Sequence, residues 1–164
     1  MKRLIVYVHG KGGSAQEAEH YKSLFPKDEV IGFDYRSQTP WQAKKEFFAF
    51  FTEQRGRCEH LTLVANSIGA FFALSSLDET LVDRTYFISP IVDMENLICN
   101  MMQWSGVTEQ ELALTSIETV SAFAKLHHAD LTVIPGGEHW FHTDEQMQFL
   151  DKWIRERSLN DVCG

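Results

Sequence analysis

Short apolar runs alternate with longer amphipathic stretches along this chain. Runs at 3–8, 61–65, 84–88 and 131–135 are each followed by glycine, serine or asparagine in a turn-like stretch, and a more mixed run covers 29–35. Continuous apolar runs of this length are typical of strands that are buried on both faces, as in a parallel sheet. The pattern therefore predicts about five strands.

Amphipathic stretches with helical periodicity separate these runs. The predicted helices cover residues 15–25, 41–54, 68–77, 97–104, 108–114, 116–128 and 144–157. Three of them begin with recognisable caps: Ser14 with Glu17 three residues later, Thr39 followed by Pro40, and Thr143. Strands that alternate with helices predict a three-layer α/β/α architecture around a mainly parallel sheet.

Length and charge narrow the class of protein. The 164 residues fit a single domain, 1–164, and 44% hydrophobic with 23% charged residues is an ordinary globular composition. The net charge of −8 argues against a nucleic-acid-binding surface, which needs a basic patch. No stretch is long enough to predict a membrane span. We read the apolar N-terminus as a first strand, because its run is too short for a signal peptide.

The cysteines and histidines predict no metal site. Cys58, Cys99 and Cys163 are odd in number and widely separated, which favours reduced thiols and a cytoplasmic location. His127 and His128 are adjacent and cannot share a helix face. We therefore expect no metal, no cofactor, no nucleic-acid or membrane partner, and a small molecule as the ligand.

The stretch from Leu61 to Leu74 carries the strongest candidate chemistry. An apolar strand leads into Ala65-Asn66-Ser67-Ile68-Gly69, and a helix of small and apolar residues follows. A strand, a sharp turn with a serine and a helix form the nucleophile elbow, here with alanine in place of the first glycine. Such a turn lifts the Ser67 hydroxyl above the strand ends, where the amide of Ile68 opens the next helix.

Two further loops follow predicted strands. His9-Gly10-Lys11-Gly12-Gly13 comes directly after the first strand, and Gly136-Gly137-Glu138-His139 comes after the run 131–135. The glycines permit tight backbone turns in both loops. Each loop taken alone would suit a simple chain reversal, but their order around Ser67 favours a shared site.

Together these motifs resemble those of the α/β-hydrolases, in particular small serine esterases, and the resemblance covers nearly the whole chain. It implies that Ser67 is a nucleophile, that His139 is its general base, and that the amides of Lys11 and Ile68 form an oxyanion hole. It also implies that His9, Gly10, Gly12 and Asn66 border the substrate. Members of this family need no cofactor for the reaction.

The resemblance fails at the catalytic acid. The family carries an acidic residue after one more strand, and residues 105–129 contain no strand-like run. Asp93, which follows the strand 84–88, is the preferred candidate, and Glu138 lies beside His139. A serine–histidine dyad is the third option. Asp34 precedes Ser67 and breaks the usual order of serine, acid and histidine.

The function implied by the resemblance is hydrolysis of small esters or thioesters through an acyl-enzyme on Ser67, with peptidase activity as a further possibility. The lack of a large insertion that could form a lid favours small substrates. The alternative is a hydrolase fold that has lost its acid and serves as a binding module for a small molecule or a protein.

Overall fold

The computed structural model describes residues 2–78, 80–91, 117–137, 139 and 141–159. Its strands are β1 (Arg3–Val8), β2 (Glu29–Phe33), β3 (His60–Asn66) and β4 (Arg84–Ile88). Its helices are the 3₁₀ turn η1 (Ala15–Glu17) and the α-helices α1 (Ala18–Lys22), α2 (Pro40–Arg55), α3 (Ile68–Ser76), α6 (Ile117–Leu126) and α7 (Asp144–Leu159).

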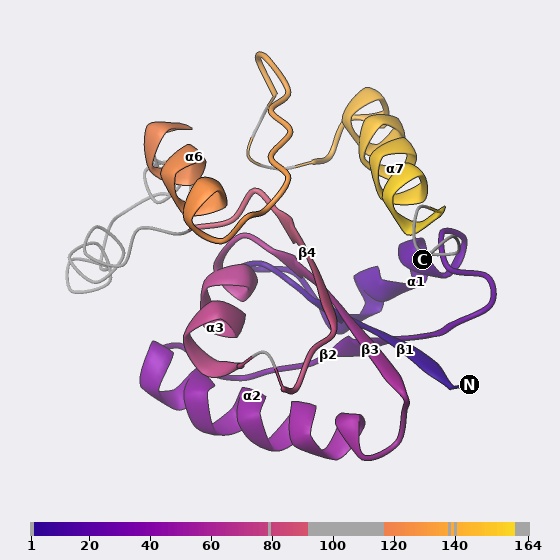
Figure 1. The fold of residues 1–164 in the computed structure, drawn as a ribbon, viewed down its shortest axis with the longest axis vertical. Coiled ribbons are helices and arrows are strands. Elements are labelled where there is room, and N and C mark those ends of the chain that lie inside the picture. The colour runs from indigo at the N-terminus through magenta and orange to yellow at the C-terminus, as the bar shows by residue number, and fades with distance from the viewer. Residues whose placement is uncertain (1, 79, 92–116, 138, 140, 160–164) are drawn as a thin grey trace.

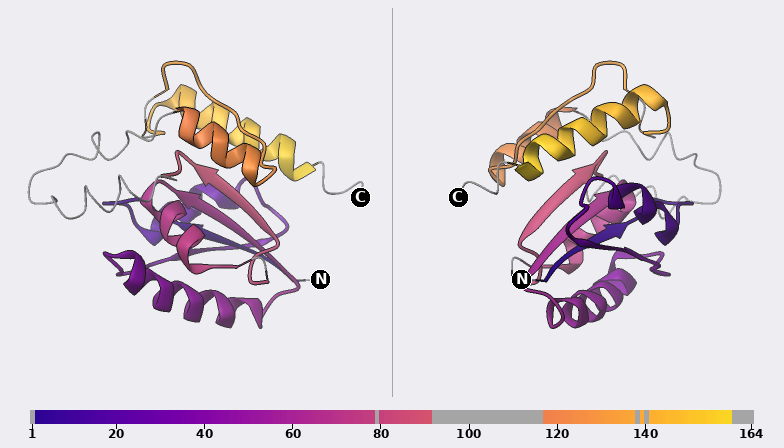
Figure 2. Two further views of the ribbon diagram at one scale, coloured as in Figure 1. Left: turned by 60° about the vertical axis from the view of Figure 1, so that its left-hand side comes forward. Right: turned by 90° about the vertical axis from the view of Figure 1, so that its right-hand side faces the viewer.

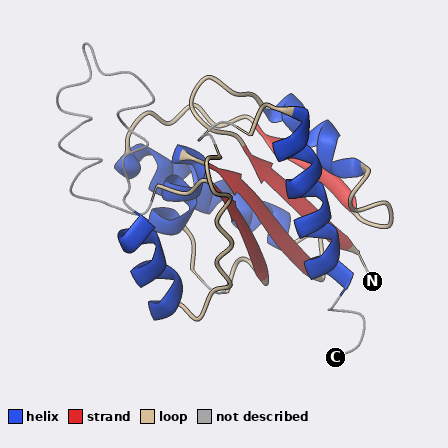
Figure 3. Ribbon diagram, turned by 90° about the horizontal axis from the view of Figure 1, so that it is seen from above, coloured by secondary structure: helices blue, strands red, loops and turns tan. Residues whose placement is uncertain are grey.

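The four strands form one parallel sheet in the order β2-β1-β3-β4. Helices α2 and α3 cover one face, and α1 and α7 cover the other (Figures 1 and 2). The sheet is thus the middle layer of three, as Figure 3 shows from above. The predicted α/β architecture with a parallel sheet is confirmed.

Side chains of the central strands alternate between two apolar clusters. Val6, Val8 and Leu63 pack with α2 and α3, whereas Ile5 and Tyr7 pack with α1 and α7. This explains why β1 and β3 are apolar at nearly every position: both faces of each strand are buried.

The sequence of α2 explains where this helix begins and which of its faces is buried. The Thr39 hydroxyl accepts a hydrogen bond from the Gln42 amide at 3.4 Å, and Pro40 occupies the first helical position. Ala43, Phe47 and Phe51, spaced four residues apart, are completely buried against the sheet. The predicted cap and the buried stripe therefore both form.

The prediction of a strand at residues 131–135 is wrong. This segment is not part of the sheet, and no backbone hydrogen bond joins it to β4 in the described part of the chain. A strand forms only when a neighbouring edge pairs with it, and a cavity lies between this segment and β4. The sheet that the structure describes consequently has four strands instead of about five.

Candidate active site

Ser67 occupies the sharp turn between β3 and α3. Its backbone has φ 52° and ψ −121°, and a positive φ is uncommon for a residue with a side chain. The residue is only 5% exposed. The predicted sharp turn between a strand and a helix therefore forms, with a strained backbone at the serine.

Gly69 explains how the helix can begin so close to the sheet. A Cβ atom at this position would lie 2.4 Å from the His9 carbonyl oxygen and 3.1 Å from that of Val8. These are backbone atoms at the end of β1, and they cannot rotate away. The absence of a side chain at Gly69 lets α3 approach β1 closely and fixes the position of Ser67.

His139 lies against Ser67 although 72 residues separate them in sequence. Its Nε2 atom is 2.8 Å from the Ser67 hydroxyl oxygen, a hydrogen-bond distance. The loop that delivers His139 turns at Gly136, which has φ 69°, a conformation that favours glycine. The structure therefore brings the two principal residues predicted from sequence together.

Burial controls the charge of this histidine. Removal of the imidazole from water lowers the pKa of His139 below its ordinary value of 6.5. The neutral ring is then the main form near neutral pH, and its unprotonated Nε2 can accept a proton from Ser67. The arrangement has the geometry and protonation state that a general base requires.

No carboxylate among the described residues pairs with His139. Both acids considered from sequence, Asp93 and Glu138, lie outside the described residues. Asp34 lies in the loop after β2 and is exposed. The carboxylate that holds this loop belongs to Glu46 on α2, which accepts hydrogen bonds from the amides of Arg36 and Ser37, both at 2.9 Å.

The loop after β1 lies directly beside the serine. A Cβ atom at Gly10 would be 3.2 Å from the Ser67 Cβ, so this glycine borders the serine. Gly13 N–H donates to the Gly10 carbonyl at 3.2 Å and closes a tight turn around Lys11 and Gly12. Ile68 opens α3, where the first-turn amides have no acceptor within the helix.

His9 and Asn66, both expected to border a substrate, differ in exposure. His9 is 8% exposed and its ring stacks on Tyr35 with 4.4 Å between centroids. Its Nδ1 lies 2.7 Å from the Gly10 carbonyl oxygen. Asn66 is half-buried at the end of β3, and Gly12 is exposed. Within the described residues, His9 Nε2 is buried without a hydrogen-bond partner.

Two supporting residues, Tyr35 and Tyr7, were not identified from the sequence. The Tyr35 hydroxyl donates to the His9 carbonyl at 2.9 Å. Tyr7 donates to Glu17 at 2.6 Å, and Glu17 also accepts from the Ser14 amide at 2.8 Å. Burial raises the pKa of Tyr7 well above its ordinary value, so its hydroxyl stays a donor. The capping box revealed the Glu17–Ser14 contact, but no sequence pattern marks the tyrosine contacts.

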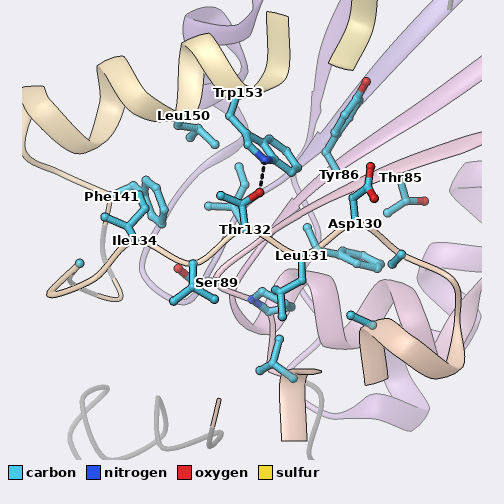
Figure 4. Close-up of a pocket in the computed structure, with 18 of the residues that line it drawn as sticks. Thr85, Tyr86, Ser89, Asp130, Leu131, Thr132, Ile134, Phe141, Leu150 and Trp153 are labelled. Atoms are coloured by element: carbon cyan, nitrogen blue, oxygen red, sulfur yellow. Dashed lines mark hydrogen bonds between the residues drawn. The ribbon is translucent and has the colours of Figure 1, made fainter. Parts of the chain in front are cut away.

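A cavity of about 680 Å³ extends from this site along the outer side of β4. We call it the β4 cavity (Figure 4). Its walls are β4, the segment 129–134, α6 and α7, and both His139 and Ser89 line it. The candidate site is therefore continuous with this cavity. The sequence had predicted no such cavity, because it contains no large insertion that could form a lid.

Two absences apply to the described part of the chain. Its histidine, cysteine, aspartate and glutamate side chains form no cluster of three that could hold a metal ion. None of its helices combines the length and apolarity needed to cross a bilayer.

Comparison with known proteins places the fold. No protein-family model and no curated protein matches the sequence. A carboxylesterase from Mesorhizobium loti is similar in structure, with a TM-score of 0.63, 14% identity, and coverage of 94% of this chain and 88% of that one. An uncharacterised protein from Bacillus cereus has a TM-score of 0.64 and 17% identity; the match covers 94% of this chain but 60% of that one. With its parallel sheet, its serine elbow and these structural neighbours, the chain has the α/β-hydrolase fold.

Proposed function

We propose that this protein is a serine hydrolase that cleaves carboxylic esters through an acyl-enzyme on Ser67. The observation that carries the proposal is the 2.8 Å contact between the Ser67 hydroxyl and His139 Nε2. A serine in a strained turn beside a neutral, half-buried histidine has the two features that activate a hydroxyl for attack.

The mechanism has two stages. His139 takes the proton as the Ser67 oxygen attacks the ester carbonyl, and then gives it to the departing alcohol. Water, activated by the same histidine, hydrolyses the acyl-enzyme and regenerates Ser67. We assign the amides of Lys11 and Ile68 to the oxyanion, where each donor contributes about 3 kcal/mol to the transition state.

Substrate preference follows from the same site. We propose carboxylic esters first, with thioesters or peptides as weaker substrates, since an oxyanion hole serves all three carbonyl groups. His9, Gly10, Gly12 and Asn66 remain our candidates for residues that border the substrate. We propose Asp93 as the acid that orients His139; it lies outside the described residues.

The experiment is covalent labelling with a fluorophosphonate probe, followed by peptide mapping. An activated serine reacts with this probe whatever its natural substrate. We expect modification at Ser67, none in Ser67→Ala, and strong loss in His139→Ala. Ser75→Ala is the matched control, because this serine lies on α3 and its hydroxyl donates to the Phe71 and Phe72 carbonyls of the same helix.

Asp93→Asn tests the acid. Loss of the orienting carboxylate reduces turnover by about 10⁴-fold in a serine triad. A loss of that size supports Asp93, whereas wild-type turnover would contradict it and leave Glu138 or a dyad.

A binding module is the second candidate, favoured by one observation: within the described residues no carboxylate supports His139. Failure of the folded protein to label at Ser67, together with no turnover of p-nitrophenyl acetate, would contradict the hydrolase proposal and favour this alternative. Far-UV circular dichroism confirms that each variant is folded.

A further inference from the structure

The sheet ends at β4 with an edge that no described strand covers. The Ser67 amide donates to the Ile88 carbonyl at 2.9 Å, so the backbone of Ile88 faces β3. Backbone groups alternate in direction along a strand, which directs those of Thr85 and Phe87 to the outer side. An outer edge of this kind is a ready template for another strand.

The opposite wall of the β4 cavity is also a backbone. The segment 129–134 runs past β4 on the far side of the cavity (Figure 4). The segment is anchored to α7, since the Thr132 hydroxyl accepts a hydrogen bond from the Trp153 indole at 2.9 Å. No backbone hydrogen bond links it to β4 within the described residues. The cavity therefore lies between two main-chain walls.

The remaining two walls are mostly apolar side chains, with Arg157 of α7 as the charged exception. Helix α6 contributes Val120, Phe123 and Ala124, and α7 contributes Phe149, Leu150 and Trp153. The two helices approach from different sides of the sheet plane (Figure 1). Leu131, Val133 and Phe149 remain 40%, 51% and 40% exposed, so apolar surface is left without contacts here.

These four walls match the surroundings of an inner strand in a three-layer protein. Such a strand has main chain on both sides and apolar helices on both faces. A hydrocarbon chain would fill the apolar walls but would offer nothing to the backbone of Thr85 and Phe87. An extended peptide offers both side chains and backbone donors and acceptors.

We propose that the β4 cavity binds one extended segment of another polypeptide, which adds to the sheet as a strand beside β4. The segment is about five residues long, to match β4, and carries β-branched or apolar side chains on both faces. A second copy of this chain is a poor occupant through its own β4, because that strand is enclosed by α6, α7 and 129–134 of its own copy. The proposal does not depend on catalysis at Ser67.

The test uses the full chain and a fluorescent peptide, Lys-Val-Thr-Ile-Val-Thr-Val-Glu, with both ends blocked. Its matched control is the same peptide N-methylated at every second residue, which keeps the side chains and removes the backbone donors of one edge. Fluorescence anisotropy measures both affinities. We expect saturable binding of the parent peptide and at least about tenfold weaker binding of the methylated one.

Thr85→Pro supplies a second, independent readout. Its amide faces away from β3, so proline removes no hydrogen bond within the sheet but blocks strand addition. We expect wild-type circular dichroism and at least about tenfold weaker peptide binding. Equal affinity for the parent and methylated peptides, with displacement of both by decanoate, would show an apolar pocket only and overturn the proposal. So would undetectable binding of the parent peptide to the folded wild-type chain.

Discussion

At the scale of single residues, the candidate site depends on two residues that adopt a positive φ angle. Ser67 has φ 52° at the turn into α3, and Gly136 has φ 69° at the turn that precedes His139. Such conformations cost about 1–3 kcal/mol for a residue with a side chain and persist only where the surroundings fix them. Ser67 accepts this strain, and its hydroxyl meets the histidine at 2.8 Å as a result.

The charge state of His139 gives a prediction at this scale. The ring must be neutral to accept the serine proton, and burial lowers the pKa of His139 below 6.5. In Asp93→Asn, which lacks the acid that we propose, the labelling rate should therefore rise with pH through a midpoint below 6.5 and stay constant above it. The measurement is the second-order rate of fluorophosphonate labelling at Ser67 between about pH 5 and about pH 8.

The same titration distinguishes a dyad from a triad. A carboxylate beside the ring would stabilise the imidazolium and raise the pKa. A midpoint above 6.5 in the wild-type chain, together with one below 6.5 in Asp93→Asn, would support Asp93 as the acid beside His139, whereas midpoints below 6.5 in both proteins would indicate a dyad. The hydrolysis rate of the probe without protein, measured at each pH, serves as the baseline.

At the scale of elements, the packing of α3 against β1 assembles the site. Helix α3 buries seven of its nine residues, and its Gly69 lies against the carbonyl groups of Val8 and His9. The elbow and the loop after β1 are thereby held together, with Gly10 beside Ser67. A change in the distance between these two elements would displace both Ser67 and the proposed oxyanion donors.

Gly69→Ala tests this packing. The new methyl group would lie 2.4 Å from a backbone oxygen, and we expect a loss of about 1–3 kcal/mol in the free energy of unfolding and slower labelling of Ser67. Urea unfolding measures the first effect. Gly56→Ala is the control, because its nearest neighbour would be 3.5 Å away and its φ of −67° suits alanine. Equal midpoints for the two variants would contradict the close approach.

Elements with a strong local signal were predictable from sequence. Strands β1 and β4 have the bounds that their apolar runs indicate, and the caps at Thr39 and Thr143 both form, with the Gln146 amide donating to the Thr143 hydroxyl at 3.3 Å. The run 131–135 has an equally good strand composition, yet no neighbour pairs with it. Composition describes the residue, whereas strand pairing depends on a partner elsewhere in the chain.

The same distinction between local signals and distant contacts applies to the candidate site. Ser67 and His139 were predictable because turns with small residues mark them. The contacts of Tyr35 with His9 and of Tyr7 with Glu17 were not, since they join residues through tertiary packing alone. Sequence motifs locate the two side chains of the candidate site, and only the folded chain shows which contacts hold them.

At the scale of the whole molecule, stability is unevenly distributed. Most of the core lies between α1, α2, α3 and the sheet, and α6 buries a single residue, Ala124. Leu126 at the end of α6 is 75% exposed. The half of the molecule that borders the β4 cavity therefore has fewer buried apolar contacts than the rest.

Hydrogen exchange followed by mass spectrometry tests this distribution. Amides with few buried neighbours open with a low free energy, so those of α6 should exchange about 100-fold faster, or more, than those of α3. Peptides that cover 117–126 and 68–76 provide the comparison. Equal protection of the two helices would show that α6 is held as firmly as the core and would contradict the prediction.

The sheet order also determines when the protein can fold. β1 is the first strand of the chain, yet one of its two edges pairs with β3, where Arg3 faces His60 and Val8 faces Ala65. That edge stays open during synthesis until the residues of β3 have emerged. Contacts so distant in sequence slow folding, because the loop between them must close before any pairing is gained. The loop after β1 and the serine turn stand at the ends of these two strands, so closure of this pair brings the loop and Ser67 together, and the later part of the chain then adds His139.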